Sequence, residues 1–273
     1  MCPEFLKIGN FVIYWYGVMV AIGVMIGSLV FQRLARRNGY PQELSSQIIF
    51  WSVAWGIIGG RVLHVAVQFP YYYRNPYEII SIRNGGLAAE GAIISAFIFL
   101  CIYSRVRNFN IRRILDMIAV PVPLAQALGR IGCFLNGCCY GKLSTSGFSV
   151  KFPYLATRVH PTQLYYAAGH VLIFLFLLHL MRKKPKDGIL FSAYIMCFSL
   201  MRYLLDNLRG DLLPNQIGLY PTQAIALLMF AGGLFWFISS AKQADTAGEQ
   251  AERPEQETIP PEKEEKKNGQ VDF

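Results

Sequence analysis

The chain has 273 residues, of which 53% are hydrophobic and only 16% are charged, and its mean hydropathy is +0.33. An ordinary soluble domain carries roughly 25% charged residues, so this composition argues against a water-soluble protein. Apolar runs close to the roughly 20 residues that cross a bilayer recur along the chain, too many for a signal peptide or a single anchor. The sequence therefore predicts that the membrane domain makes up most of the protein.

The net charge of +9 is unevenly distributed along the chain. Residues 242–273 contain five Lys and Arg against nine Asp and Glu, a sum of −4, which leaves +13 on residues 1–241. Beside apolar helices, such an excess is typical of cytoplasmic loops and of contact with anionic lipid. We therefore predict the lipid bilayer as a partner and no nucleic acid.

The predicted fold class is all-α, a polytopic membrane protein with about seven transmembrane helices. Each predicted helix is mostly apolar and is bounded by charged residues, Pro or Gly. In chain order, the helices are expected at residues 11–34, 46–68, 86–104, 114–136, 161–182, 188–208 and 219–240.

Basic residues concentrate in the connections after the first, third and fifth predicted helices. These residues are Arg33, Arg36, Arg37, Arg105, Arg107, Arg112, Arg113, Arg182, Lys183, Lys184 and Lys186. The positive-inside rule places these connections in the cytoplasm. With an odd number of helices, the N-terminus is then outside and the C-terminus is cytoplasmic.

The last 33 residues differ from the rest of the chain in composition. Residues 241–273 are rich in Glu, Lys, Gln and Pro and bury too little apolar surface to offset the entropy of ordering. We predict a membrane-embedded domain over 1–240 and a disordered, charged cytoplasmic tail over 241–273.

Ionisable residues within the predicted helices are few, and each costs at least about 2.5–3.5 kcal/mol to insert. They are Arg61, His64, Glu90, Asp116, Arg130, His170, His179, Arg202 and Asp206. Some of them can form structural pairs, such as Arg130 with Asp116 or Arg202 with Asp206 at helical i, i+4 spacing. Several arginines with few acids to neutralise them instead indicate an anionic ligand, for which phosphate is the natural candidate.

Glycine, amide and thiol groups are concentrated at the end of the fourth predicted helix, residues 129–141. The pattern Cys133-x4-Cys138-Cys139 could bind a metal, but no second Cys/His pair with zinc-like spacing accompanies it. Small buried thiols or one disulfide are the alternatives. The six cysteines of the chain do not indicate a redox compartment, and we predict neither a metal nor another cofactor.

Short motifs distributed along the membrane domain resemble the prolipoprotein diacylglyceryl transferase family, bacterial membrane enzymes that add a lipid to lipoprotein precursors. Their order and spacing together carry the resemblance. They are Tyr14-Trp15-Tyr16-Gly17, Gly59-Gly60-Arg61, Gly85-Gly86-Leu87, Gly129-Arg130-x-Gly132-x-Phe134-x-Asn136-Gly137, His160-Pro161-Thr162-Gln163-Leu164-Tyr165, and Arg202 with Arg209.

The chain departs from the family pattern at four positions. The family usually has His where this chain has Glu90, Asn at Cys133, and an acid at Cys138 and at Tyr166. The resemblance therefore indicates a divergent member or a paralogue.

The resemblance implies transfer of diacylglyceryl from phosphatidylglycerol to the cysteine thiol of a lipobox-containing prolipoprotein, in the bacterial cytoplasmic (inner) membrane. The products are a thioether and glycerol phosphate. A lipid-binding paralogue with another acceptor or no transferase activity is the first alternative. A small-molecule transporter is the second, although no evident internal repeat supports it.

The resemblance also implies roles for individual residues. Arg130 and Arg202 would hold the phosphate and stabilise the leaving group, and Tyr16 and Asn136 would orient the head group. Glu90 would accept the thiol proton in place of the family's histidine, or else would be a counter-ion to an arginine. The predicted catalytic residues are Arg130, Arg202, Glu90 and Tyr16. The predicted substrate-binding residues are Arg61, Asn136, Gly141, His160, Gln163, Tyr165 and Arg209.

Overall fold

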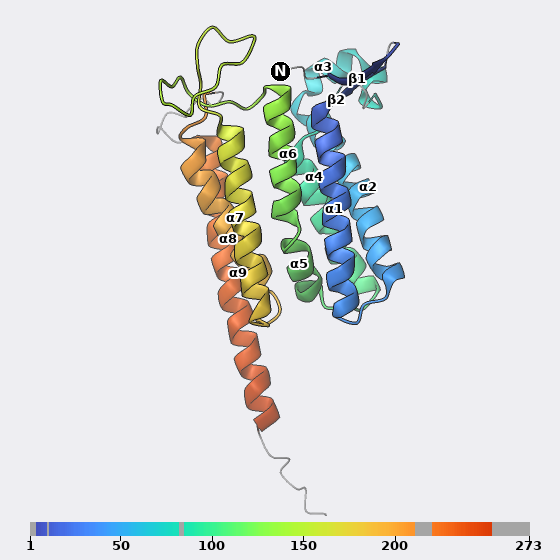
Figure 1. The fold of residues 1–273 in the computed structure, drawn as a ribbon. Coiled ribbons are helices and arrows are strands. Elements are labelled where there is room, and N and C mark those ends of the chain that lie inside the picture. The colour runs from blue at the N-terminus through green and yellow to red at the C-terminus, as the bar shows by residue number, and fades with distance from the viewer. Residues whose placement is uncertain (1–3, 10, 82–84, 211–219, 253–273) are drawn as a thin grey trace, which may run out of the picture.

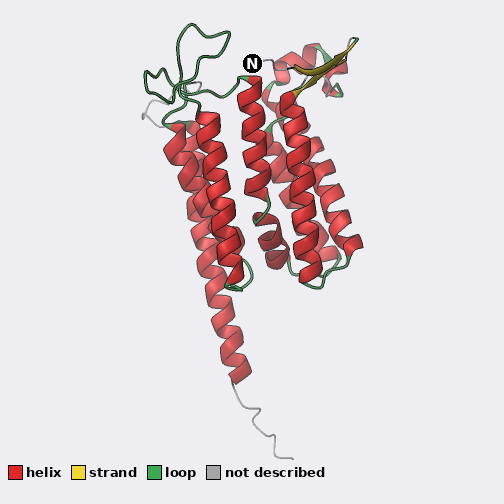
Figure 2. Ribbon diagram, in the orientation of Figure 1, coloured by secondary structure: helices red, strands yellow, loops and turns green. Residues whose placement is uncertain are grey.

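The computed structural model describes residues 4–9, 11–81, 85–210 and 220–252. The helices are α1 (Trp15–Arg37), α2 (Gln42–Val67), α3 (Phe69–Arg74), the 3₁₀ turn η1 (Pro76–Ile79), α4 (Ala89–Val106), α5 (Ile111–Ala119), α6 (Val122–Asn136), α7 (Thr162–Arg182), α8 (Ile189–Asp206) and α9 (Pro221–Glu252). Strands β1 (Glu4–Ile8) and β2 (Phe11–Tyr14) pair as an antiparallel hairpin before α1. The described chain is thus mostly helical, with one short hairpin and one long connection (Figure 2).

Six helices of the described chain are long and apolar enough to cross a membrane, and α5 with α6 gives a seventh, bent span. The prediction of an all-α membrane protein with about seven transmembrane helices is therefore confirmed. Their outward surface is apolar, with Leu228 and Phe235 of α9 74% and 75% exposed. Such a surface is stable when lipid covers it, which identifies a multi-pass membrane protein.

The fourth predicted helix, 114–136, is broken in the structure. Helices α5 and α6 meet at an angle of 41°. The break falls at Pro121, which precedes Val122 and Pro123, and prolines donate no backbone hydrogen bond and clash with the preceding turn. The predicted start of the first helix is also wrong, because residues 11–14 form β2 and α1 begins at Trp15.

The helices form two groups joined by α6 (Figure 1). On one side, α1 packs on α6 and α2 packs on α4, while on the other side α7 packs on α6 and α8 packs on α7 and α9. The α2–α4 contact is very close, because a Cβ added to Gly59 would lie 2.7 Å from the Gly91 carbonyl oxygen. The glycines before Arg61 therefore permit close helix packing.

A buried carboxylate joins α5 to the start of α8. The amide of Gly188 donates to Asp116 Oδ2 at 2.6 Å, and the amide of Phe191 donates to Asp116 Oδ1 at 2.7 Å. A carboxylate is favourable at a helix N-terminus, where amide groups lack partners within the helix. Asp116 thus accepts hydrogen bonds from the N-terminus of α8. The alternative pair of Arg130 with Asp116 is not formed.

Basic residues end three of the helices at one end of the bundle. Arg36 and Arg37 end α1, Arg105 lies in the last turn of α4, and Arg182 ends α7, all at the end of the bundle that also holds the start of α5. The long connection 137–161 lies at the opposite end, over α7 and α8 (Figure 1). Helix α9 continues past the predicted boundary at 240 to Glu252, and the rest of the predicted disordered tail, 253–273, lies outside the described residues.

Candidate functional site

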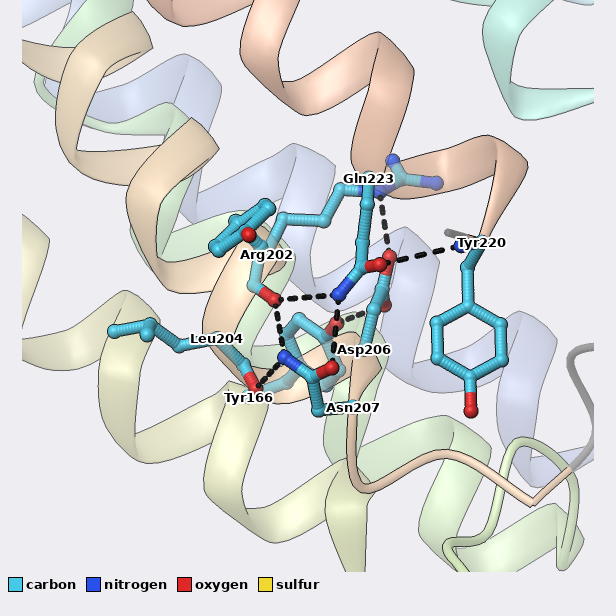
Figure 3. Close-up of polar contacts among 8 residues, drawn as sticks. Tyr166, Arg202, Leu204, Asp206, Asn207, Tyr220 and Gln223 are labelled. Atoms are coloured by element: carbon cyan, nitrogen blue, oxygen red, sulfur yellow. Dashed lines mark hydrogen bonds and ion pairs between the residues drawn. The ribbon is translucent and has the colours of Figure 1, made fainter. Parts of the chain in front are cut away.

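A hydrogen-bonded tyrosine–aspartate pair lies between α7 and α8. The Tyr166 hydroxyl donates to Asp206 Oδ1, and both side chains are fully buried (Figure 3). The other oxygen, Oδ2, accepts no hydrogen bond from the described residues and faces Arg202 Nε at 3.6 Å. Arg202 and Asp206 are one helical turn apart, so the predicted i, i+4 pair is formed.

Arg130 of α6 reaches the same pair from another helix. Its Cζ lies 4.4 Å from the centroid of the Tyr166 ring, a cation–π contact. Arg130 forms no ion pair with the acids of the described residues, whereas Arg202 is paired with Asp206. The structure therefore brings Arg130 and Arg202 together around Tyr166 and Asp206, with the Arg130 charge not neutralised by a carboxylate.

The helical period explains why these side chains meet. Arg130, Cys133 and Asn136 recur every three residues and share one side of α6, while Gln163, Tyr166 and His170 form a buried stripe on α7. Helices α6 and α7 pack against each other. The site is thus the interface between these two faces, closed by the end of α8.

Tyr16 approaches this interface from α1. A Cβ added to Gly132 of α6 would lie 3.2 Å from the Tyr16 Cα, so the two helices cross closely at this glycine. Tyr16 therefore lies beside Gly132, the residue before Cys133 on α6. Tyr16 is 46% exposed, which leaves it accessible from outside the bundle.

The thiols of Cys133, Cys138 and Cys139 form a compact cluster at the end of α6. Their Sγ atoms all lie within 4.8 Å of one another, and all three residues are free cysteines. Hydrogen bonds from the thiols of Cys133 and Cys139 and from Asn136 hold the pKa of Cys138 well below its usual range. The predicted alternative of a disulfide is thus not formed in this structure.

Local backbone geometry builds this cluster. Gly137 ends α6 in the left-handed conformation with φ 77°, and Cys139 also has positive φ, 61°. The start of α7 holds the turn, since Thr162 Oγ1 donates to the Cys139 carbonyl at 2.8 Å and Gln163 Nε2 donates to the Cys138 carbonyl at 2.6 Å. Gln163, predicted to bind substrate, therefore positions the cysteine turn.

The other predicted substrate-binding residues of this region anchor the connection 137–161. The Gly141 amide donates to the His160 carbonyl at 2.8 Å, and Gly141 forms a β-bridge with Arg209. His160 Nδ1 lies 3.3 Å from the Tyr165 hydroxyl. These residues join α6, α7 and α8 at the end of the bundle that holds the cysteine cluster.

Arg61 differs from the prediction that it binds substrate. Its Nε, Nη1 and Nη2 atoms together donate hydrogen bonds to the backbone carbonyls of five residues. The acceptors are Glu78, Ile79, Ser81, Gly85 and Gly86. A guanidinium has five N–H groups, so these contacts leave none for a phosphate. Arg61 holds the connection between α3 and α4 in place.

Glu90 lies in the first turn of α4 and is exposed. It forms no hydrogen bond or ion pair with the described residues, so the alternative of an arginine counter-ion is not seen among them. Helix α4 packs chiefly on α2, and the structure shows no polar contact of Glu90 with the pair Tyr166–Asp206.

Sequence reasoning missed the contribution of Tyr166 and Asp206 as a unit. The family tends to have an acid at position 166, and here the Asp206 carboxylate of α8 lies against the tyrosine that replaces it. The available signals were the period from Gln163 to Tyr166 and the i, i+4 spacing from Arg202 to Asp206. Neither signal shows that helices α7 and α8 place these residues in contact.

Fold and site together define a multi-pass helical membrane protein with an arginine-rich polar site inside the bundle. The chain matches the family model described as prolipoprotein diacylglyceryl transferase over residues 3–239. The chain belongs to this family.

Relatives named phosphatidylglycerol–prolipoprotein diacylglyceryl transferase align over most of their length. The protein of Clostridium tetani is 33% identical over 242 residues, covering 87% of this chain and 97% of the relative. That of Dehalococcoides mccartyi is 37% identical over 256 residues, covering 89% and 96%. That of Staphylococcus aureus is 33% identical over 237 residues, covering 83% and 85%.

Proposed function

We propose that this protein transfers the diacylglyceryl group of phosphatidylglycerol to the cysteine thiol of a prolipoprotein. Phosphatidylglycerol and prolipoprotein appear in the names of relatives that align with 83–89% of the chain. The single structural observation that supports the proposal is the meeting of Arg130 and Arg202 at the Tyr166–Asp206 pair. It provides a cationic site within the membrane domain for a lipid phosphate.

In the proposed reaction, the cysteine sulfur attacks the glyceryl carbon that bears the phosphate ester. A carbon–sulfur bond forms, the carbon–oxygen bond breaks, and glycerol phosphate leaves with the bonding electrons. Arg130 and Arg202 stabilise the charge that develops on the phosphate, where fixed positive groups contribute most to catalysis. Asp206 orients Arg202, and Tyr166 positions Arg130 through its ring.

The thiol must lose its proton, because the thiolate is the nucleophile and a free cysteine has a pKa of about 8.5. We assign Glu90 as the proton acceptor, supported by a carboxylate at the start of α4 that has no partner among the described residues and by its position in the family motif. Tyr16 and Asn136 orient the lipid head group by hydrogen bonds. We further propose the bacterial cytoplasmic membrane as the location, with the end that holds the connection 137–161 on the outer side.

The test is a transfer assay with the purified full-length protein, phosphatidylglycerol vesicles and a fluorescent lipobox peptide. A peptide mass increase equal to diacylglyceryl, together with release of glycerol phosphate, is the expected result. A peptide with Ser in place of its Cys is the matched control and should remain unmodified. Binding of phosphatidylglycerol without peptide modification would instead identify the lipid-binding paralogue.

A further inference from the structure

The three clustered thiols of the α6–α7 connection have no part in the proposed transfer reaction. Cys133 lies in the last turn of α6, and Cys138 and Cys139 lie in the turn that follows it. The last turn of α6 and the left-handed Gly137 that ends it reverse the chain, so that residues five and six positions apart in sequence face one another. The described residues contain no other group of His, Cys, Asp or Glu with this ligand geometry.

We propose that Cys133, Cys138 and Cys139 bind one thiophilic d¹⁰ cation, with Zn²⁺ as the probe ion. Zn²⁺ binds thiolates at about 2.3 Å, which places the sulfurs of a tetrahedral site roughly 3.8 Å apart. The three Sγ atoms already lie within 4.8 Å of one another. Side-chain rotations that move the sulfurs by about 1 Å would bring them to the spacing of a zinc site. Soft thiolate ligands select Zn²⁺ or Cu⁺ over Mg²⁺ and Ca²⁺.

The backbone that carries the ligands is held by independent contacts. Thr162 and Gln163 of α7 donate hydrogen bonds to the carbonyls of Cys139 and Cys138. Cys139 has a positive φ of 61°, a backbone conformation that a non-glycine residue keeps only where its surroundings enforce it. The backbone of the ligands is thus positioned before a cation arrives.

A buried polar atom beside the cluster lacks a partner. Gln163 is fully buried, and its Nε2 donates to the Cys138 carbonyl, but its Oε1 has no hydrogen-bond partner among the described residues. A buried acceptor without a partner destabilises the fold. Three thiolates leave the fourth tetrahedral position to water, and a metal-bound water is a strong donor for such an oxygen.

The surrounding charge suits a thiolate-rich site. Three thiolates with Zn²⁺ carry a net charge of −1, and the basic residue Arg209 pairs through its backbone with Gly141, two residues after Cys139. Cys133 follows Arg130 by three residues on the same side of α6, which connects the cluster to the arginine site. The proposed cation therefore lies next to the proposed lipid site without using its arginines.

The test is cation binding by the reduced, chelator-treated full-length protein in detergent. Titration with Co²⁺ should give sulfur-to-metal charge-transfer bands and tetrahedral d–d bands that saturate at one ion per chain and are lost when Zn²⁺ displaces Co²⁺. Cys133→Ser, Cys138→Ser and Cys139→Ser should each weaken Zn²⁺ binding by more than about tenfold. Cys101→Ser and Cys197→Ser, which alter cysteines of α4 and α8, are matched controls and should bind as the unmodified protein does.

A second measurement needs no variant, in case a serine variant fails to fold. Stoichiometric Zn²⁺ should slow maleimide modification of Cys138 and Cys139 in the unmodified protein, as read by peptide mass spectrometry. Saturating bands that persist in all three serine variants would overturn the proposal. So would a Cys133–Cys138 disulfide in the freshly purified protein, or modification rates that Zn²⁺ does not change.

Discussion

The guanidinium of Arg130 lies over the ring of Tyr166, with the Arg130 Cζ 4.4 Å from the ring centroid. The hydroxyl of the same ring is bonded to Asp206, which in turn faces Arg202. One aromatic side chain therefore connects the two arginines that the sequence singled out. Each member of this arrangement makes a distinct prediction.

Arg130→Lys and Arg202→Lys test the phosphate-binding role. Lysine keeps the charge but loses the planar fork that binds phosphate through two hydrogen bonds and stacks on a ring. We expect each change to lower kcat/KM by about 10²–10³-fold, as for loss of one preorganised donor. The measurement is steady-state transfer from phosphatidylglycerol to a lipobox peptide. Arg107→Lys, at the other end of the bundle, is the control, and equal activity of all three variants would remove the arginines from the mechanism.

Tyr166→Phe tests the contribution of the Tyr166 hydroxyl apart from that of its ring. The variant keeps the face on which Arg130 packs but leaves the buried Asp206 Oδ1 without its donor, which costs about 1–3 kcal/mol. We expect a lower melting temperature and retained Arg130 function. Tyr165→Phe, which removes a neighbouring hydroxyl of the half-buried Tyr165, is the matched control. A Tyr166→Phe protein as stable as the control would show that the hydrogen bond to Asp206 contributes little.

Arg61→Lys tests whether Arg61 stabilises the connection between α3 and α4 or instead binds substrate, as the sequence predicted. Lysine has three donors on one atom and cannot satisfy five carbonyls spread over residues 78–86. We expect lower thermal stability, with KM and turnover per folded molecule near those of the unmodified protein. A KM for phosphatidylglycerol raised tenfold or more at unchanged stability would restore the predicted lipid-binding role.

Glu90→Gln tests the assignment of the proton acceptor. Glutamine preserves size and hydrogen bonding but accepts no proton, so turnover should fall by the about 10²–10⁴-fold typical of lost general-base catalysis. Glu90→His should retain part of the activity, since the family usually has histidine there. Glu78→Gln, in η1, is the control for loss of a nearby carboxylate. Turnover of Glu90→Gln within a few-fold of normal would exclude the assignment.

Reporter fusions test the orientation in the membrane. Fusions after Arg107 and after Lys184 follow the basic ends of α4 and α7, and both should report the cytoplasm. A fusion within 144–148, in the connection between α6 and α7, should report the outside. An external signal from either basic site would reverse the proposed placement of the catalytic end.

The sequence was sufficient to locate the spans because a helix that faces lipid on most of its surface must be apolar over nearly its whole length. It was insufficient at the α5–α6 break, where Val120, Pro121 and Val122 continue the apolar run and hydropathy does not register the lost backbone hydrogen bond. The N-terminal hairpin was missed for a related reason: its second strand, Phe11–Tyr14, is as apolar as the helix that follows, so hydropathy does not separate the two.

The site shows the same limit in another form. Arg130 and Arg202 could be predicted because charges inside a span are costly and therefore few. The contact of Tyr166 with Asp206 joins residues 40 positions apart and depends on how α7 and α8 pack. The role of Arg61 depends on carbonyl groups, which every residue has and no sequence pattern distinguishes. The cysteines were visible as a motif, but only the turn at Gly137 shows that the three thiols converge.

The Asp116 carboxylate sets an order for assembly of the protein during synthesis. Its two amide partners, Gly188 and Phe191, are 72 and 75 residues later in the chain. When the ribosome has delivered α5 to the membrane, both partners are still unmade, and an unpaired carboxylate is costly at that depth. Asp116 in the bent span α5–α6 therefore obtains these two hydrogen bonds only after α8, the sixth span, has entered the membrane beside it.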